Sequence, residues 1–210
     1  MARINAPQLN RLCITFFNQI VFDTRQFIRF VNRTPTFKAV ERGHLTFGDD
    51  GARVKLSSVS SLTPLFGRLS VKIPCRELDR QVSSLEQVFT SSLRPISTLE
   101  DLYIHKVLYS RLHRHDNINN ALVWLELLHS FFAVKNLYIC KTFAPHIVPA
   151  LQELVGVRTT EVLPTLQNIF LEELQASGHV LEGIRQFVAA RQVTGHPIAV
   201  SRWDDPEQDM

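Results

Sequence analysis

The 210-residue sequence lacks most of the features that mark an enzyme or a metal protein. Its three cysteines, Cys13, Cys75 and Cys140, are far apart and lack metal-ligand spacing, so we expect reduced thiols of an intracellular protein. Its eight glycines never cluster as in a phosphate-binding or dinucleotide-binding loop. No Gly-x-Ser-x-Gly motif and no thiol-protease signature is present. We therefore expect a protein that is not an enzyme and uses no cofactor.

Runs of like charge and long apolar runs are also missing. The 23 basic and 20 acidic residues give a net charge of +3 and are scattered, which argues against a nucleic-acid partner. The most apolar stretch, 122–134, is too short for a membrane span and contains Glu126 and His129. No apolar signal-peptide core follows residues 1–7. We expect a soluble cytoplasmic or nuclear protein that does not bind membranes.

What the sequence does contain is a repeat. A segment of the form apolar-x-x-apolar-x-apolar occurs at 98–104, 133–139 and 165–171, and an earlier copy lies at 8–14. We call the first apolar residue of each copy its anchor, and the candidate anchors are Leu9, Phe37, Phe66, Leu99, Val134 and Leu166. They are spaced 28 to 35 residues apart, which suits one strand and one helix per unit, as in leucine-rich repeats.

Segments of helical periodicity separate most of these copies. We predict helices over 24–32 and 78–89, a helix capped by Asn117, one beginning near Pro145, and one capped by Ser177. Their inward stripes include Leu122 in the third helix and Val155 in the fourth. The second copy fits worst, and 44–47, followed by a tight turn at 49–51, is the alternative position of its strand. Residues 197–200 predict a final short strand.

The predicted fold is therefore an α/β, leucine-rich-repeat-like solenoid of about six strand–helix units over residues 1–202, with a hairpin insert near 44–57 and a polar tail at 203–210. Each unit buries its apolar face only against its neighbours. Parallel strands lie about 4.8 Å apart and helices are about 10 Å wide, so the parallel sheet should line the concave side and the helices the convex side.

Alternation along the strands predicts a binding face. Leu102 and Ile104 should point toward the helices, and every second residue should point outward. The outward positions of three successive units form an aromatic column flanked by two polar rows, and we predict that they bind a protein partner: Asp101, Tyr103, His105, Asn136, Tyr138, Cys140, Asn168, Phe170 and Glu172. Alternatively, the rings only stack on one another, or a loop covers them.

Three other features have a functional and a structural interpretation. His105, His113 and His115 could form a metal-dependent hydrolase site, but Asp116 follows His115 directly and the next expected His is missing, so we expect a solvated loop and no metal. Trp124 and the leucines beside it could dock a partner, but helical apolar positions usually face their own core. Arg185 and Arg191 should lie on a solvated helix face.

Several segments resemble the C-terminal region of fungal F-box proteins with leucine-rich-repeat-like units. The likeness covers most of the chain and lies in 124–129, 134–139, 150–155, 163–168, 186–191 and 197–200. It implies a role as the substrate-recruiting repeat region of a cullin-RING ubiquitin ligase. The F-box, a helical segment opened by Leu-Pro, is absent, so binding to the ligase adaptor is not implied for any residue. The likeness suggests a fragment or truncated paralogue, and an orphan structural domain without a dedicated partner is the alternative.

Overall fold

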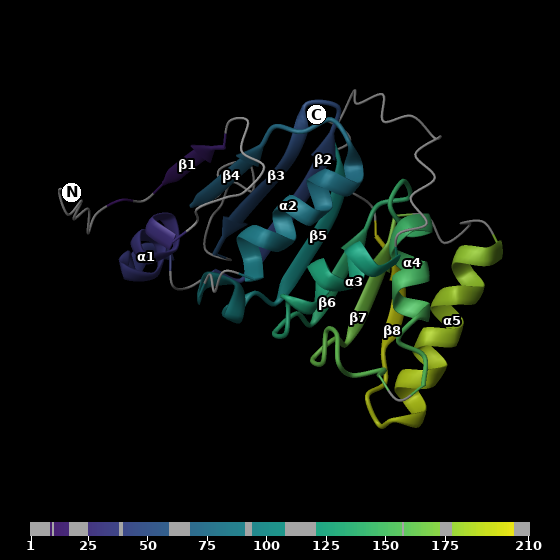
Figure 1. The fold of residues 1–210 in the computed structure, drawn as a ribbon. Coiled ribbons are helices and arrows are strands. Elements are labelled where there is room, and N and C mark those ends of the chain that lie inside the picture. Colours follow the sequence, from purple (N-terminus) through teal and green to yellow (C-terminus); the bar gives the residue numbers. More distant parts are fainter. Residues whose placement is uncertain are drawn as a thin grey trace.

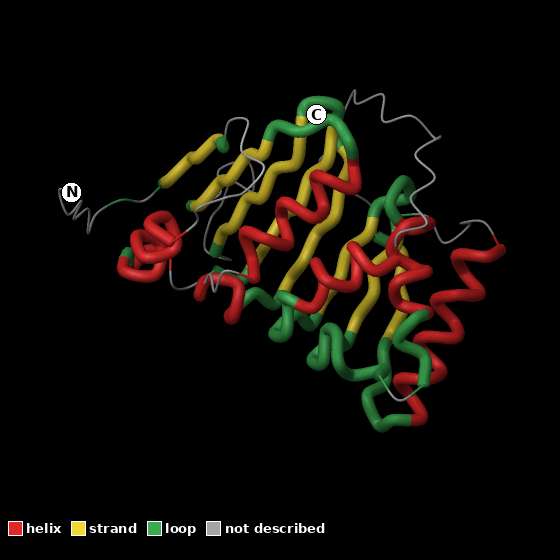
Figure 2. The backbone as a smooth tube through the Cα atoms, in the orientation of Figure 1, coloured by secondary structure: helices red, strands yellow, loops and turns green. Residues whose placement is uncertain are grey.

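The computed structural model describes residues 9, 11–16, 25–37, 40–58, 68–90, 94–107, 121–156, 158–172 and 178–203. They form an α/β fold with one eight-stranded, mostly parallel sheet (Figures 1 and 2). The strand order is β1-β4-β3-β2-β5-β6-β7-β8. Five α-helices accompany the sheet in the described ranges, and α2 to α5 line up along one of its faces.

The C-terminal strands follow one another in chain order. They are β5 (Asp101–Lys106), β6 (Asn136–Ile139), β7 (Asn168–Leu171) and β8 (Ala199–Arg202). Each pair is parallel and in register, so that Leu102, Leu137, Ile169 and Val200 are level with one another. The prediction that the segments starting at 99, 134 and 166 are adjacent members of one parallel ribbon is confirmed.

The second repeat begins at Val40 and not at Phe37. Strand β2 (Arg42–Gly48) pairs in parallel with β5, and Phe37 lies in a short 3-10 helix, Pro35–Phe37. The carbonyl of Glu41 accepts hydrogen bonds from the N–H groups of Glu100 and Asp101. The carbonyl of Glu100 does the same for residues 135 and 136, and that of Lys135 for residues 167 and 168. One hydrogen-bond pattern thus joins β2, β5, β6 and β7.

The N-terminal strands depart from the consecutive stacking that we predicted. The hairpin is confirmed: β2 and β3 (Gly51–Ser57) are antiparallel, with Gly51 at φ 136° in the turn. Because β3 occupies the outer edge of β2, β4 (Leu69–Ile73) pairs with β3, and β1 (Leu12–Thr15) pairs in parallel with β4. The first and third units are therefore neighbours, and β3 alone runs against the other strands.

The helices are α1 (Arg25–Arg33), α2 (Leu78–Thr90), α3 (Ala121–His129), α4 (Ala144–Gln152) and α5 (Gly178–Val193), with a second 3-10 helix at Arg94–Thr98. The predicted stripe of α2 is buried, and Trp124 of α3 is fully buried in the core, as expected. Leu122 and Val155, predicted to face inward, are 67% and 46% exposed, because α3 buries Trp124 and Leu127 instead and α4 ends at Gln152.

Arg191 on α5 corrects a further prediction. Its side chain is fully buried rather than solvated, and its guanidinium donates hydrogen bonds to the carbonyl oxygens of Thr159, Leu163, Pro164 and Leu166 at 3.1 to 3.3 Å. The connection between α4 and β7 thereby gains donors for carbonyl groups that no strand or helix satisfies. Desolvation lowers the pKa of Arg191.

No helix in the described ranges is both long and apolar enough to cross a bilayer.

Candidate functional site

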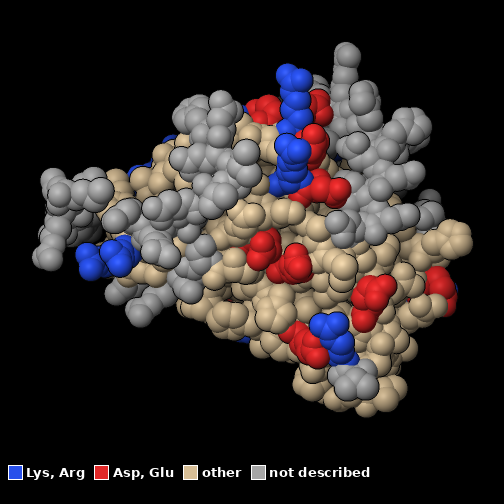
Figure 3. All heavy atoms as spheres, viewed as in Figure 1, with Lys and Arg blue, Asp and Glu red and all other residues tan. Residues whose placement is uncertain are grey.

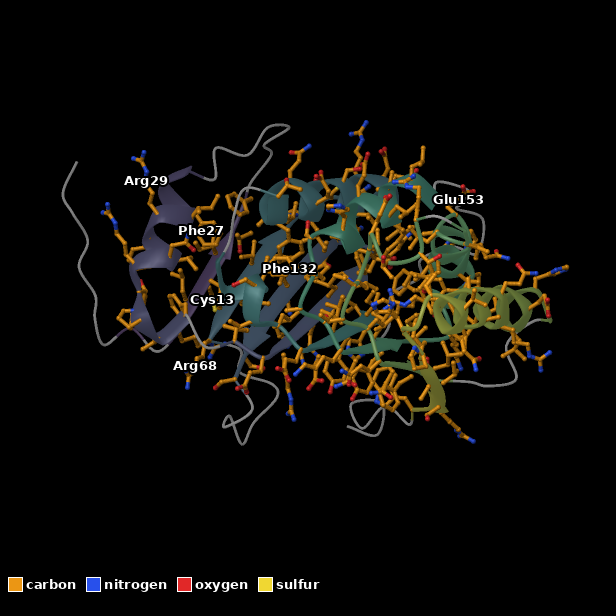
Figure 4. All side chains as sticks on the ribbon, turned by 90° about the horizontal axis from the view of Figure 1, so that it is seen from below. Cys13, Phe27, Arg29, Arg68, Phe132 and Glu153 are labelled. Atoms are coloured by element: carbon orange, nitrogen blue, oxygen red, sulfur yellow. The ribbon has the colours of Figure 1, made fainter. Side chains whose placement is uncertain are left out.

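Within the described ranges, helices cover one face of the sheet and no helix covers the other. Leu102, Ile104, Leu137 and Ile169 point into the layer between sheet and helices and are fully buried. Figure 4 shows the layers edge-on, with helices on one side and side chains projecting from the sheet on the other. We call this second side the open face. Alternation along each strand decides which side chains reach it.

Seven of the nine residues predicted to bind a partner lie within β5, β6 and β7 at positions that project from this open face, whereas Cys140 and Glu172 directly follow β6 and β7, and Cys140 is part of the hydrophobic core. Strand register aligns the members of two rows across the strands, and a third row continues past the ends of β6 and β7. We name these the amide row (Asp101, Asn136, Asn168), the ring row (Tyr103, Tyr138, Phe170) and the buried row (His105, Cys140, Glu172). Members of the first two rows are half-buried, and those of the third are buried. The structure therefore brings the predicted residues together.

The ring row is a continuous stack. The ring centroids of Tyr103 and Tyr138 are 4.1 Å apart, and those of Tyr138 and Phe170 are 4.4 Å apart, with planes within 9° of parallel. His44 of β2 extends the stack at 4.5 Å from Tyr103, because β2 pairs with β5 in the register His44 to Tyr103. The rings therefore stack on one another, as in one of the alternatives to a binding face given above. The three residues are nevertheless half-exposed.

The amide row is linked by side-chain hydrogen bonds. Asn136 Nδ2 donates to Asp101 Oδ1 at 2.7 Å, and Asn168 Nδ2 donates to Asn136 Oδ1 at 2.7 Å. Arg42 of β2 pairs with the other Asp101 oxygen at 3.5 Å. These bonds fix the side-chain orientations of the row, so little rotamer freedom remains to be lost if a partner binds.

Trp203 covers part of the open face. Its backbone N–H donates to Leu171 O beside β7, and its ring lies edge-on against His105 at 5.2 Å and Tyr138 at 5.5 Å. We expected this residue to begin a polar tail, but it is only 9% exposed. Glu172, in the buried row with His105, accepts a hydrogen bond from the Lys141 backbone N–H at 2.7 Å. Trp203 thus packs against Tyr103 and Tyr138 of the ring row as well as against His105, and the members of the ring row and the amide row stay half-buried.

The two tyrosines are poor acids in this setting. Burial, followed by the nearby Tyr138 and Asp101, raises the pKa of Tyr103 far above its usual value. Burial also raises the pKa of Tyr138. Both hydroxyls therefore stay protonated at neutral pH and can donate hydrogen bonds.

The described residues hold no group of three or more His, Cys, Asp or Glu side chains that could bind a metal ion. His113 and His115 lie outside the described residues. The imidazole of His105 stacks on that of His44, with His44 Nδ1 and His105 Nε2 3.2 Å apart. Burial raises the pKa of Cys140, which disfavours the thiolate form that a nucleophile requires.

Sequence reasoning missed the basic part of the open face. In the hairpin, Lys55 is level with His44, and Arg53 is level with Thr46. Lys72 of β4 is level with Arg53 in turn. All three are on the open face, because directly opposed residues of antiparallel strands share a face. Alternation of residues on both sides of the predicted turn at 49–51 could have placed Arg53 and Lys55 on this face. Placing Lys72 beside Arg53 required the pairing of β3 with β4, which the sequence does not show.

Comparison with known proteins yields no relative: no protein-family model, no curated protein and no solved structure matches this chain.

Proposed function

We propose that this protein is a non-enzymatic interaction scaffold that binds another protein through the open face of β2, β5, β6 and β7. The observation that carries the proposal is the pair of half-exposed rows, one aromatic and one of amides, on the face opposite the helices. Tyr and Phe rings supply large contact areas at protein interfaces and lose little conformational entropy when they are held in place beforehand.

The finer fold assignment belongs to the same proposal. We propose that β2 and β5 to β8, with their helices, are leucine-rich-repeat-like units whose sheet lies on the concave side. The chain order of β5 to β8, their register, and the shared carbonyl pattern support it. By resemblance, the role is that of the substrate-recruiting region of an F-box-type ubiquitin-ligase subunit. Binding to the ligase adaptor is not part of the proposal.

Site-specific photocrosslinking in cells tests the binding face. A benzoyl-phenylalanine placed at Phe170 reports contacts of the ring row, and the same residue placed at Leu122 reports the helix side. Leu122 is a matched control because it is an exposed apolar residue away from the open face. We expect a discrete crosslinked protein from position 170 and none from position 122.

A second variant separates binding from folding. Tyr138→Ala in the chain that carries the crosslinker at 170 should reduce the crosslinked species several-fold while the chain still melts cooperatively. A cooperative melt without any crosslink from position 170 would favour the orphan-domain interpretation and contradict the proposal.

A further inference from the structure

The three rows do not end at β2 but continue into the N-terminal strands, where their chemistry changes. The ring row passes from His44 to Lys55 on β3. The line that contains the buried row passes through Thr46 to Arg53 on β3 and Lys72 on β4. The open face is therefore aromatic and amide-rich on β5 to β7 and cationic on β3 and β4.

Two of these cations have no salt-bridge partner within the described ranges. Lys72 is paired with Asp50, and Arg42 is paired with Asp101. Lys55 and Arg53 form no ion pair there. Arg53 contributes only weakly to the lowered pKa of Asp50, for which the hydrogen bond from Lys72 is the main cause. By contrast, the helix side in Figure 3 shows charges of both signs scattered over a largely uncharged surface.

We propose that the open face binds an extended segment of a partner protein that carries acidic side chains at one end and apolar side chains at the other. The acidic end lies over Lys55 and Arg53, and the apolar end lies over half-exposed Phe170 and the part of Tyr138 that Trp203 does not cover. This inference rests on the proposed function and names the partner's chemistry.

The dimensions suit a short segment. From β3 to β7 there are four strand spacings, or about 19 Å at about 4.8 Å each. An extended chain covers that distance with about six residues at roughly 3.3 Å each. The amide row beside it can donate to and accept from the backbone of such a segment, because Asn side chains carry both donors and acceptors.

Peptide fits this face better than single-stranded nucleic acid does. Bases bind by stacking on free ring faces. Here Tyr103 and Tyr138 each have both faces covered by neighbouring rings, so the row presents mainly ring edges. Ring edges carry partial positive charge, which attracts carbonyl and carboxylate oxygens.

The test measures fluorescence anisotropy of a labelled heptapeptide with three acidic residues, a proline and three apolar residues. We expect saturable binding to the full chain that weakens with added salt. The variant R53E/K55E should reduce affinity at least about tenfold, since unpaired charges are reversed. The matched control R29E/R185E makes the same change of charge at exposed arginines on α1 (Figure 4) and α5, and it should bind like the wild type.

The inference is wrong if affinity falls equally in R29E/R185E. It is also wrong if a peptide with lysines in place of the acidic residues binds equally well, or if a ten-nucleotide oligo-thymidine strand binds more tightly. The chain's own residues 204–209 include four acidic side chains. Binding seen only in the variant D204N/D205N/E207Q/D209N would assign the face to that segment and also overturn the inference.

The two proposals fail separately. If the position-170 crosslink forms but the acidic peptide does not bind, only the chemistry assigned to the partner is wrong. If neither is observed, the binding role of the face is wrong as well.

Discussion

In the C-terminal half of the sheet, β5 to β8 lie side by side in chain order, whereas in the N-terminal half β1 to β4 do not. The C-terminal units share one sequence pattern and one set of contacts. Thr98 and Thr165, each directly before its anchor, donate through the hydroxyl to the anchor carbonyl of the preceding unit, Val40 or Val134. The two units with Thr before the anchor therefore form the same hydrogen bond to the preceding unit, whereas Ala133 has no hydroxyl to form it.

The N-terminal half shows what interrupts such a series. The hairpin places β3 on the free edge of β2, and a strand edge can pair only once. The first and third units still align with each other, with Leu12 level with Leu69 and Ile14 level with Val71. A single inserted strand thus changed the order of the units without abolishing their register.

We expect the largest loss of stability from a substitution in the C-terminal half. Replacing Arg191 with Met removes the donor of four hydrogen bonds to carbonyl oxygens, three of them buried and one partly buried, and we expect a loss of about 4 kcal/mol in the free energy of unfolding. Urea denaturation measures it. Arg185→Met on the same helix, at an exposed position, should change stability by less than about 0.5 kcal/mol. Equal effects of the two variants would contradict the role of Arg191.

In the N-terminal half, we expect the largest loss of stability from a substitution in the hairpin. In Gly51→Ala the new Cβ would lie 2.2 Å from Ile73 O, in a backbone conformation that L-residues rarely adopt, and we expect a loss of about 3 kcal/mol. Gly156→Ala is the control: φ is also positive, but the new Cβ would meet no non-adjacent atom of the described residues within 4 Å, so the cost should be about 1 kcal/mol. Hydrogen exchange should show the loss of protection concentrated in β3 and β4.

The ring row should contribute less. Tyr138→Ala removes a ring that stacks on two others and touches Trp203, with an expected loss of about 2 kcal/mol. Tyr138→Phe keeps the stack and should cost below about 0.5 kcal/mol. A red shift of tryptophan fluorescence in the alanine variant alone would report exposure of Trp203, since Trp124 is buried in the core.

The smallest expected effect is a dependence of folding stability on pH in the alkaline range. The pKa of Tyr103 is raised in the folded state above its ordinary value of 10.0, so the neutral form is favoured by folding. The contribution of Tyr103 to folding stability is fully present below pH 10 and is lost as the pH rises above 10. The reason is that Tyr103 loses its proton at a lower pH in the unfolded chain than in the folded one. Urea midpoints at pH 9 and 11 should fall less in Tyr103→Phe than in the wild type. An equal fall in both would show that other groups cause it.

Much of the candidate site could be predicted because it depends on local periodicity. Alternation at Leu102, Tyr103 and Ile104 assigned each side chain to its face, and the repeat placed Tyr138 and Phe170 in the same row. Residue Lys55 was not predicted as part of that row, because its position depends on which strand lies next to which. Trp203 was assigned to a tail because nothing near it in sequence shows that its ring reaches β5.

Arg191 illustrates the same limit within a helix. Its own neighbours on α5 suggested an exposed position, and the four carbonyl groups that it satisfies come from a segment about thirty residues earlier. Helical periodicity describes which face a residue occupies, but it does not describe which unpaired backbone groups face that position.

The sequence alone determined the repeating strand and helix units, the inward and outward faces of β5 to β7, and the tight turn of the hairpin. Each of these follows from residues close together in the chain. The tertiary structure decided the strand order β1-β4-β3-β2, the cover that Trp203 provides, and the meeting of cations with the ring row. Those outcomes depend on which strand edges and backbone groups are still unpaired when distant segments pack together, and no local pattern contains that information.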